Sequence, residues 1–388
     1  MQRVHLKRTK RLHAGHLWVF SNELYENPKQ YLPGSLVEVC DMHDGFIGIG
    51  YINPRSLIAI RLLAKQKQDI DVQFLKQRIS SAIQLRKQLV GERDAYRIIY
   101  SEGDYLPGLI ADRYGGCLVL QFLTYGMEVM KDQVVELLDE MLGPETIVLR
   151  NDSRMRSLEG LPLYKEIVKG NLDSLPIIHE DGVEFEINPY EGQKTGFFLD
   201  QRENRLRLKQ FIRKGRGLDL FSYVGAWSMH LASTGAEITC VDSSERAIAH
   251  AKRNTELNNA GDKISYAVED VFSYLEREVT TGEKTYDFIV LDPPAFVKSA
   301  NKLNEAVKAY RGINEASMRL VRPGGIFATS SCSYHLSREL FLEMLNAAAK
   351  NAGRSIRLIE LRSQAPDHPI LLSMPETEYL KCAFLVVD

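Results

Sequence analysis

The second half of the chain alternates between short apolar runs and longer stretches with apolar residues at helical spacing. Runs of strand length are GLDLF (217–221), AEITCVD (236–242), ISYAVED (264–270), YDFIVLDPPAF (286–296) and IFATSSC (326–332), and KCAFLVVD (381–388) closes the chain. Helical patterns follow most of these runs, and Pro-Gly-Gly at 323–325 predicts a turn before one of them. The alternation predicts an α/β fold with a doubly wound, mainly parallel sheet and helices on both faces over residues 183–388.

The first part of the chain has a different pattern. Residues 1–70 contain short alternating runs separated by Gly and Pro (GSLVEVCD, GFIGIGYI, SLIAIRLL), which predict a small β domain. Residues 72–90 (VQFLKQRISSAIQLRKQLV) have the spacing of an amphipathic helix, and further strands and a helix over 127–142 follow. We therefore expect a central α+β domain over 72–182, and three domains in all.

Composition places the protein among ordinary globular chains. It has 388 residues, 44% hydrophobic and 26% charged, and contains no apolar run of the ~18 residues that a membrane span needs. The N-terminus lacks the apolar segment of a secretory signal, so a cytoplasmic location is expected. The formal net charge of −2 excludes a globally basic protein. The first 22 residues, however, contain five Lys or Arg and no acid.

The five cysteines, at 40, 117, 240, 332 and 382, are widely separated. No C-x-x-C pair is present, which argues against a zinc site and a disulfide framework, and we expect no metal. Cys40 and Cys117 fall inside apolar strands and are assigned to the core. Cys332 ends the predicted strand 326–332. Ligands of doubly wound sheets bind at the carboxyl ends of strands, so we place Cys332 at the mouth of the pocket.

The loops after the predicted strands indicate which cofactor the sheet binds. The first loop, in DLFSYVGAWS, lacks both the G-x-G-x-x-G of a dinucleotide site and the G-K-[ST] of a nucleotide loop. It opens instead with Asp219, whose charge repels phosphate and attracts an ammonium or sulfonium. Asp242 ends the second strand, where an acid accepts hydrogen bonds from ribose, and Glu269-Asp270 end the third, near an adenine amine. These groups together favour S-adenosylmethionine (SAM).

The motifs DLFSYVGAWS, VDSS, EDVF, LDPPAF and SSCS, in this order, resemble the class I, Rossmann-like SAM-dependent RNA methyltransferases. GHLWVFSNEL and GYINPRSLIAIRLL resemble the PUA RNA-binding domain, and GQKTGFFLDQREN resembles a further cofactor-binding segment. Over the whole chain, the resemblance is to the large-subunit (23S) ribosomal RNA cytosine-5 methyltransferases of the RlmI type. It implies that the cofactor contacts are Lys194, Thr195, Gly196, Asp219, Phe221, Ser222, Tyr223, Gly225, Asp242, Asp270 and Asp292.

Methylation at carbon 5 of cytosine needs a nucleophile at the pocket, because that carbon does not attack a sulfonium methyl unaided. A thiolate that adds to carbon 6 makes the ring nucleophilic, and we assign this role to Cys332. Asp292, on a loop stiffened by Pro293 and Pro294, is expected to hydrogen-bond N3 and the exocyclic amine. Phe296 is expected to stack on the base. The base that removes the carbon 5 proton is unassigned, with hydroxide and Asp292 both open.

Three alternatives remain at this point. The sequence DPPAF also resembles the [DN]-P-P-[YF] loop of amino-group methyltransferases, which modify guanine N2 or adenine N6 without a covalent intermediate. Uracil is a further target, because the same thiol chemistry serves it. A non-catalytic RNA-binding assembly factor that has kept the fold is the third.

RNA is the expected partner. Basic residues interleaved with aromatics suit phosphate contact, and we assign it to Lys7, Arg8, Lys10, Arg11 and Arg55. Trp18 is assigned chiefly to the core of the small β domain. The target nucleotide and the state of the RNA, free or in a subunit, are not written in the sequence. The resemblance also suggests that the protein forms a homodimer, although no segment of the sequence is recognisable as a dimer interface.

Overall fold

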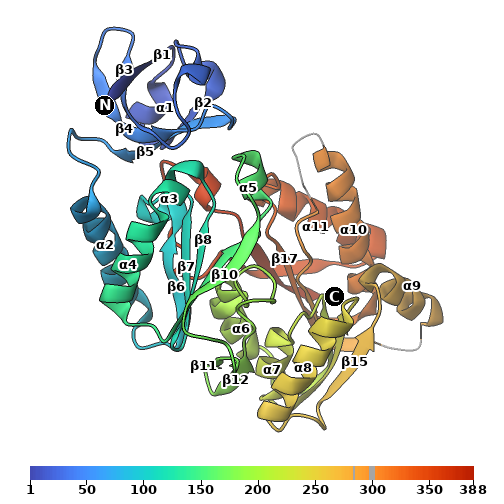
Figure 1. The fold of residues 1–388 in the computed structure, drawn as a ribbon. Helices are drawn as coiled ribbons and strands as arrows, with labels where there is room; N and C mark the ends of the chain where they lie inside the picture. The colour runs from blue at the N-terminus through green and yellow to red at the C-terminus, as the bar shows by residue number, and fades with distance from the viewer. Residues whose placement is uncertain (283–284, 297–301) are drawn as a thin grey trace. The chain divides into compact units, whose positions relative to one another are not determined.

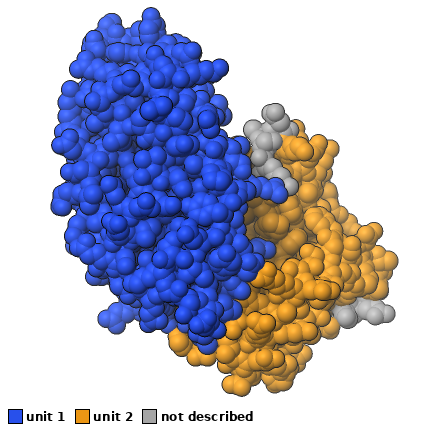
Figure 2. Space-filling model, viewed as in Figure 1, with its two compact units in different colours: residues 1–178, 187–199, 366–377 blue, residues 179–186, 200–365, 378–388 orange. Residues whose placement is uncertain are grey.

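The computed structural model describes residues 1–282, 285–296 and 302–388, which form two compact units. Unit 1 comprises residues 1–178, 187–199 and 366–377, and unit 2 comprises residues 179–186, 200–365 and 378–388 (Figure 2). Each unit thus combines segments that are distant in sequence. The domain boundaries expected near residues 70 and 182 stay predictions. No helix in the described ranges has the length and apolar character to cross a membrane.

The first sheet of unit 1 has the strand order β1-β3-β4-β5-β2. Its elements are β1 (Gln2–Leu6), α1 (Lys10–His13), β2 (Trp18–Phe20), β3 (Leu36–Asp41), β4 (Phe46–Ile52) and β5 (Ile58–Ala64). Alternate residues such as Val37 and Val39 point into a core with Val4 and Ile60, all fully buried. These elements confirm the small β structure expected for this part of the chain.

The second sheet of unit 1 has the order β10-β9-β8-β7-β6, with helices packed against it (Figure 1). Its elements are α2 (Val72–Val90), β6 (Ala95–Tyr100), η3 (Ser101–Asp104), β7 (Leu109–Tyr114), β8 (Cys117–Phe122), α3 (Tyr125–Val129), α4 (Lys131–Leu142), β9 (Thr146–Asn151), α5 (Met155–Leu158) and β10 (Tyr164–Lys169). The helix predicted over 72–90 is confirmed. The single helix predicted over 127–142 is wrong, because Met130, with φ −91° and ψ 4°, separates α3 from α4.

Unit 2 is built on a seven-stranded sheet of order β15-β14-β13-β16-β17-β19-β18. Its elements are β13 (Gly215–Leu220), α7 (Ala226–Ala232), β14 (Ala236–Asp242), α8 (Glu245–Leu257), β15 (Ile264–Val268), α9 (Val271–Thr281), β16 (Tyr286–Leu291), α10 (Leu303–Leu320), β17 (Val321–Ser331), α11 (Arg338–Ala352), β18 (Ile356–Arg362) and β19 (Lys381–Val387). Strands β13 to β17 pair in parallel, and β19 is antiparallel to both neighbours. The doubly wound, mainly parallel sheet is thereby confirmed.

The chain leaves the central strand β13 in one direction through β14 and β15, and in the other through β16 and β17. Such a reversal of strand order opens a crevice at the carboxyl ends of the strands, where ligands bind. Shorter elements complete the chain: the hairpin β11 (Ile177–Glu180) and β12 (Val183–Glu186), the turns η1 (Ser21–Glu23), η2 (Pro28–Gln30), η4 (Leu199–Gln201) and η6 (Pro375–Thr377), and α6 (Arg202–Lys209).

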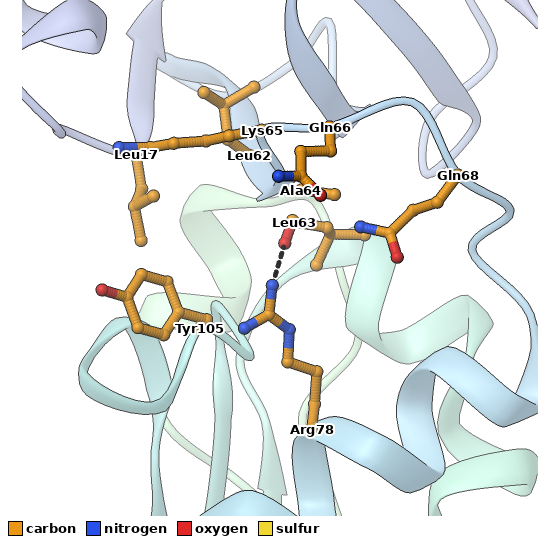
Figure 3. Close-up of a pocket in the computed structure, with 9 residues that line it drawn as sticks. All are labelled: Leu17, Leu62, Leu63, Ala64, Lys65, Gln66, Gln68, Arg78 and Tyr105. Carbon is orange, nitrogen blue, oxygen red and sulfur yellow. Dashed lines mark hydrogen bonds between the residues drawn. The ribbon is translucent and has the colours of Figure 1, made fainter.

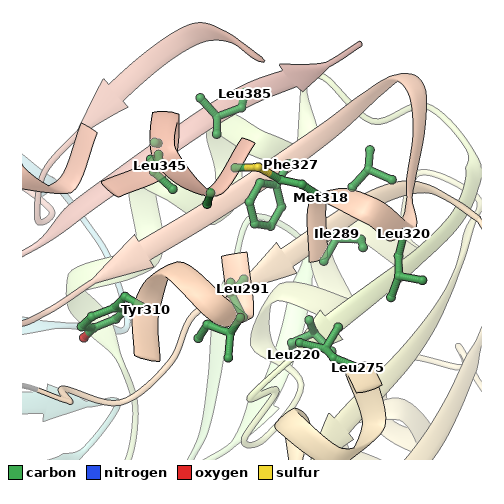
Figure 4. Packing of buried hydrophobic residues seen from close by; sticks show 14 of the residues in the cluster. Leu220, Leu275, Ile289, Leu291, Tyr310, Met318, Leu320, Phe327, Leu345 and Leu385 are labelled. Carbon is green, nitrogen blue, oxygen red and sulfur yellow. The ribbon is translucent and has the colours of Figure 1, made fainter. Parts of the chain in front are cut away.

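Helices α9, α10 and α11 pack on one face of the unit 2 sheet and enclose its main core (Figure 4). The core is made by apolar side chains of the strands, such as Ile289 and Phe327, and of the helices, such as Met318 and Leu345. Because the parallel strands are buried on this face, they present apolar residues along most of their length.

The turn predicted at 323–325 is found within the residues assigned to β17 (Val321–Ser331). The pairing with β16 shifts from Tyr286–Val321 to Phe288–Ile326, so the chain leaves the ladder between Val321 and Ile326. A Cβ on Gly325 would lie 2.6 Å from Cγ1 of Val321, which shows that the backbone turns back on itself here. Gly324 has φ +77°, a backbone conformation that other residues avoid.

Phe327 offers a test of this core, because its ring is fully buried in β17. We expect Phe327→Ala to lower the free energy of unfolding by about 3–5 kcal/mol, from lost burial and the cavity left behind. Phe327→Leu should cost less. Urea unfolding followed by circular dichroism measures both, with Leu358→Ala, on the 46% exposed Leu358, as the control. A loss no larger than that of the control would contradict the packing.

Candidate functional site at the carboxyl edge of the sheet

Asp219, the penultimate residue of β13, is a fully buried carboxylate. Its Oδ2 accepts hydrogen bonds from the main-chain N–H of Ser228 at 3.1 Å and from the Ser228 hydroxyl at 2.7 Å. Its Oδ1 has no hydrogen-bond partner among the described residues. Burial, with repulsion from Asp292 and Asp242, raises the pKa of Asp219 to about 7. The site therefore holds one buried carboxylate oxygen that a cationic ligand would satisfy.

The loop that follows β13 has a strained backbone held by a neighbouring acid. Phe221, Tyr223 and Gly225 have φ values of 62°, 49° and 77°. Asp242, at the end of β14, accepts the Tyr223 N–H and the Ser244 N–H, both at 2.9 Å. Only glycine adopts positive φ freely, so the conformation of the other two residues depends on such contacts. Strain of this kind is typical of ligand-binding loops.

Asp270 lies beyond the end of β15 and is exposed to solvent. Its carboxylate caps α9 by accepting the Ser273 N–H at 3.1 Å. The neighbouring Glu269 pairs with Arg277. The adenine contact assigned to this corner stays a prediction, and the capping bond gives Asp270 a structural role as well.

Asp292 follows β16 directly and is held by two neutral donors. The Gln201 amide donates to its two carboxylate oxygens at 3.0 and 3.1 Å, and the Trp227 indole donates to Oδ2 at 3.1 Å. The same Gln201 amide reaches the Ser330 hydroxyl at 3.1 Å. Because Leu291 pairs with Thr329, Asp292 stands level with Ser330, two residues before Cys332. Gln201 thereby joins the ends of β16 and β17.

Cys332 is the first residue after β17. It is half-buried, whereas the other four cysteines, including Cys40 and Cys117, are buried as expected. The segment after it is fixed by the buried Tyr310 of α10, whose hydroxyl lies 2.9 Å from the Ser333 hydroxyl. Tyr310 also accepts the Phe296 N–H at 3.3 Å. One phenol thus links the loops that carry Asp292 and Cys332.

Phe296 lies in a cluster of aromatic rings. Its ring centroid is 4.6 Å from that of Tyr310 and 5.9 Å from that of Phe272, and Phe221 lies at 6.5 Å. The side chain is half-buried. Stacking on a target base stays a prediction, and the structure adds that the ring is anchored by its neighbours.

Lys381 brings a buried positive charge to the same edge. It opens β19 opposite Ser331, and its ammonium donates to the main-chain oxygens of Ser333 at 2.6 Å and Tyr379 at 2.9 Å. The residue is 4% exposed, and the described residues include no carboxylate within 4.0 Å of its ammonium. Burial lowers the pKa of Lys381 to about 8, although interactions with Cys332 and Glu378 raise it.

Four further residues of the site were not predicted from the sequence: Gln201, Trp227, Tyr310 and Lys381. Trp227 belongs to the quoted motif DLFSYVGAWS and Gln201 to GQKTGFFLDQREN, but neither residue was assigned a role there. The polar residues of η4 and the lysine that opens an otherwise apolar strand were the available signals.

Lys194, Thr195 and Gly196 belong to unit 1, whereas the strand edge belongs to unit 2. Thr195 is fully buried and donates to Asp112 at 2.6 Å, and the Tyr114 hydroxyl lies 2.9 Å away. The backbones of Lys194 and Gly196 have positive φ values of 52° and 130°. Their contacts with the cofactor stay predictions.

The basic residues assigned to RNA differ in whether their side chains are free to contact a phosphate. Four of them are exposed to solvent: Lys7, Arg8, Lys10 and Arg55. Arg11 instead holds Glu23 through bonds of 2.9 and 3.1 Å, and its guanidinium lies 4.8 Å from the Phe20 ring centroid. Trp18 packs against the core of the first sheet and donates to Glu102 at 2.8 Å, which supports its assignment to packing. Within the described ranges, no group of three or more His, Cys, Asp or Glu is arranged to hold a metal ion.

Comparison with known proteins identifies the class of protein to which this fold and site belong. A family model of the S-adenosylmethionine-dependent methyltransferases matches residues 154–375, and a PUA-like domain model matches residues 3–65. The chain is 21% identical to a protein described as a SAM-dependent methyltransferase from Streptococcus mutans, with a TM-score of 0.86 over 100% of both chains. A second methyltransferase structure, complexed with SAH, gives a TM-score of 0.87, 21% identity and 100% coverage of both chains. The chain is a SAM-dependent methyltransferase with an N-terminal PUA-like domain.

Comparison with curated proteins identifies a more specific family within the SAM-dependent methyltransferases. The ribosomal RNA large subunit methyltransferase I of Shewanella amazonensis is 38% identical, with 98% of each chain covered. The protein of the same name from Pseudoalteromonas atlantica is 35% identical, with 97% of each covered. The chain belongs to the family of these methyltransferases.

The residues at the strand edge fit SAM as the cofactor. The unpartnered Oδ1 of Asp219 provides the negative group that a ligand with an ammonium and a sulfonium needs. The loop around it has the close backbone turns of a ligand cradle, and Asp242 stands at the adjacent strand end. When bound, SAM supplies an electrophilic methyl group.

The raised pKa of Asp219 predicts a pH dependence of SAM binding. Without ligand, the protonated form is favoured below about 7, so stability from this group is present at low pH and is lost as the pH rises through 7. A cationic ligand favours the ionised form, so SAM affinity should rise between pH 6 and 8. Asp219→Asn should bind SAM roughly tenfold more weakly at pH 8 and lose the rise. Calorimetric titration with SAM tests this.

The matched control is Asp262→Asn, which changes the same functional group on a side chain that is 73% exposed. It should retain both the affinity and the pH dependence. Equal SAM affinity of Asp219→Asn and the parent protein at every pH would remove Asp219 from the cofactor site.

Proposed function

We propose that the protein transfers the methyl group of SAM to carbon 5 of a cytosine in large-subunit ribosomal RNA, through a covalent adduct with Cys332. The position of Cys332 carries this proposal: a half-buried thiol directly after β17, beside the loop of Asp292. The RNA substrate is supported by relatives at 35–38% identity that are named ribosomal RNA large subunit methyltransferases, and by the PUA-like domain.

The proposed reaction begins at carbon 6. The Cys332 thiolate forms a bond to carbon 6, and the electron pair of the carbon 5–carbon 6 double bond moves into the ring toward N3. Carbon 5 is then electron-rich and would displace the sulfur of SAM at the methyl carbon: the new carbon–carbon bond would form as the methyl–sulfur bond breaks, and S-adenosylhomocysteine would leave with the electron pair. Loss of the carbon 5 proton to a base restores the double bond and expels the thiolate. The base is hydroxide or Asp292, the two candidates left open by the sequence.

Asp292 is proposed to hold the pyrimidine. A protonated carboxyl donates a hydrogen bond to N3 and draws electrons from the ring, and an ionised one accepts from the exocyclic amine. Gln201 and Trp227 fix its orientation from one side.

Lys381 is proposed to favour the thiolate form of Cys332. Its ammonium binds the carbonyl of Ser333, the residue after the cysteine, and its interaction with Cys332 is favourable. A positive charge near a thiol lowers the pKa of the thiol, and only the thiolate is nucleophilic. Lys381 therefore acts as a positioning residue for the proposed nucleophile.

The exocyclic-amine reaction is the second candidate. The Asp292-Pro-Pro-Ala-Phe296 loop favours it, because an acid and an aromatic ring on one loop suit an amine and its base. That reaction forms no bond to sulfur. It therefore predicts no role for Cys332, which separates the two candidates by experiment.

Substitution of Cys332 tests the covalent route. Unmodified large-subunit ribosomal RNA, made by transcription, is incubated with protein and SAM, digested, and analysed by mass spectrometry of nucleosides. We expect 5-methylcytidine with the parent protein and a loss of at least about 10³-fold with Cys332→Ala, because the nucleophile is removed. The control Cys382→Ala, in the neighbouring strand, should retain activity. A methylated purine amine made equally by Cys332→Ala would establish the second candidate.

Substitution of Lys381 tests the thiolate assignment without RNA. Iodoacetamide alkylation of Cys332 is followed against pH by mass spectrometry of its peptide. Lys381→Met should move the midpoint of the rate profile to higher pH and slow alkylation at pH 7 roughly fivefold, because the thiol pKa rises. Lys381→Arg should preserve the parent profile. Arg322→Met, which removes a 59% exposed cation paired with Asp287, is the control. An unchanged midpoint in Lys381→Met would contradict the assignment.

A further inference from the structure

Unit 1 contains a cavity of about 240 Å³ that the methyl-transfer site does not use. Its walls come from the end of β5 and the residues after it, from Arg78 of α2, and from Tyr105 beside η3 (Figure 3). Leu17, which precedes β2, completes the wall. The cavity thus lies where the PUA-like part of the chain meets the second sheet within one compact unit.

Arg78 presents a half-buried guanidinium to this cavity. Its Nη2 donates to the main-chain oxygen of Leu63 at 3.2 Å (Figure 3). The guanidinium carbon lies 5.2 Å from the ring centroids of both Phe74 and Tyr105. Burial lowers the pKa of Arg78, and Tyr105 is the group that opposes the shift. The charge is therefore partly desolvated and has no anionic partner among the described residues.

The buried arginines of unit 1 provide the contrast. Arg61 pairs with Glu102 at 2.8 Å and Arg86 with Asp104, and Arg150 and Arg156 also bind carboxylates. A desolvated cation without such a partner costs free energy. The half-buried guanidinium of Arg78, in contrast, forms no ion pair with a carboxylate among the described residues of unit 1. Its remaining N–H groups are therefore available to an anionic ligand.

Tyr105 supplies an exposed aromatic face in a strained conformation. Its backbone has φ 57° and ψ 30°, a left-handed conformation that a tyrosine rarely adopts. The side chain is nevertheless 39% exposed. The backbone strain at Tyr105 holds its ring beside the cavity and next to the Arg78 guanidinium. An aromatic ring in this position is suited to packing against a planar ligand.

The remaining polar lining is cationic or neutral. Lys65, Gln66 and Gln68 are exposed, and none of the described residues that line the cavity is Asp or Glu. The Lys65 ammonium lies 3.6 Å from the point where a Cβ of Gly15 would stand. Gly15 follows α1, which contains Lys10, Arg11 and His13. The cavity therefore lies next to the basic N-terminal segment. An anionic, planar ligand that extends along the surface fits this arrangement.

We propose that this cavity holds one nucleotide of the RNA substrate, with a phosphate on Arg78 and the base against Tyr105. The inference rests on the proposed RNA substrate, and it assigns a contact that lies outside the transfer chemistry. Arginine suits this role because its planar fork binds phosphate oxygens while its face stacks on aromatic rings. Base stacking on tyrosine is tolerant of sequence, so the site would contribute affinity and position.

Binding of transcribed large-subunit ribosomal RNA, measured by filter retention over a series of KCl concentrations, tests the proposal. Arg78→Met should weaken binding roughly tenfold and reduce the slope of log K against log salt by about 0.7–0.9, the value of one phosphate contact. Tyr105→Leu should weaken binding roughly fivefold with an unchanged slope, because stacking is not ionic. The control Lys76→Met removes a charge from the same helix, where Lys76 pairs with Glu140, and should bind as the parent does.

A second measurement uses the unsubstituted protein, so that misfolding of a variant does not decide the outcome. RNA containing 4-thiouridine is crosslinked by light, and the modified peptide is identified by mass spectrometry. Crosslinks to the peptide of Tyr105 support the site. Parent-like affinity and salt slope in both variants, or crosslinks confined to other peptides, would overturn it.

The RNA-binding experiment and the methylation experiment can give independent outcomes. RNA affinity is measured without SAM, so its outcome does not depend on methyl transfer, and Arg78 and Tyr105 belong to unit 1 whereas Cys332 belongs to unit 2. Loss of affinity in Arg78→Met together with an absence of 5-methylcytidine would leave the cavity proposal standing and remove the covalent one. Failure of the parent protein to bind RNA would overturn both.

Discussion

The parallel pairing of β13 with β16, and of β16 with β17, is the constraint on which the rest of unit 2 depends. Parallel strands place their carboxyl ends at one edge, so a carboxylate in one strand and a thiol after another become neighbours without any local sequence relation. Apolar packing of α9 to α11 fixes this register. A shift of one residue would turn the apolar side chains of β16 and β17 away from the core that they now fill. The packing of the core and the positions of the carboxylate and the thiol at the strand edge therefore depend on the same strand register.

The strand edge concentrates charge that the fold has only partly neutralised. Asp292 and Asp242 both repel Asp219, and Oδ1 of Asp219 has no hydrogen-bond partner among the described residues. Lys381 is held by carbonyl groups instead of a carboxylate. Buried charges without close partners are costly, and such groups are more typical of binding and catalytic sites than of structural networks. The arrangement favours ligands that bring their own charges of the complementary sign.

The sequence was sufficient for elements with strong local patterns. The helix at 72–90 and the strand at 236–242 were predicted with their observed bounds, because amphipathic spacing and a β-branched run admit few alternatives. The strand-end acids and Cys332 followed from the topology of parallel sheets. What failed was local geometry set by packing: Met130 interrupts a pattern that predicted one helix. The lysine that opens an apolar strand was a signal, but its contact with Ser333 could not be predicted, because that contact depends on an antiparallel pairing between segments far apart in the chain.

The positions of the two tryptophans give the protein a built-in pair of optical reporters. Trp18 lies in unit 1, and Trp227 lies in unit 2 with its indole N–H on the Asp292 carboxylate. Because no other tryptophan is present in the sequence, replacing one of them with phenylalanine leaves an emission signal from a single unit. The indole of Trp227 donates to the carboxylate that is proposed to hold the pyrimidine. Its fluorescence would then report occupancy of the strand edge, while that of Trp18 would report the integrity of the other unit.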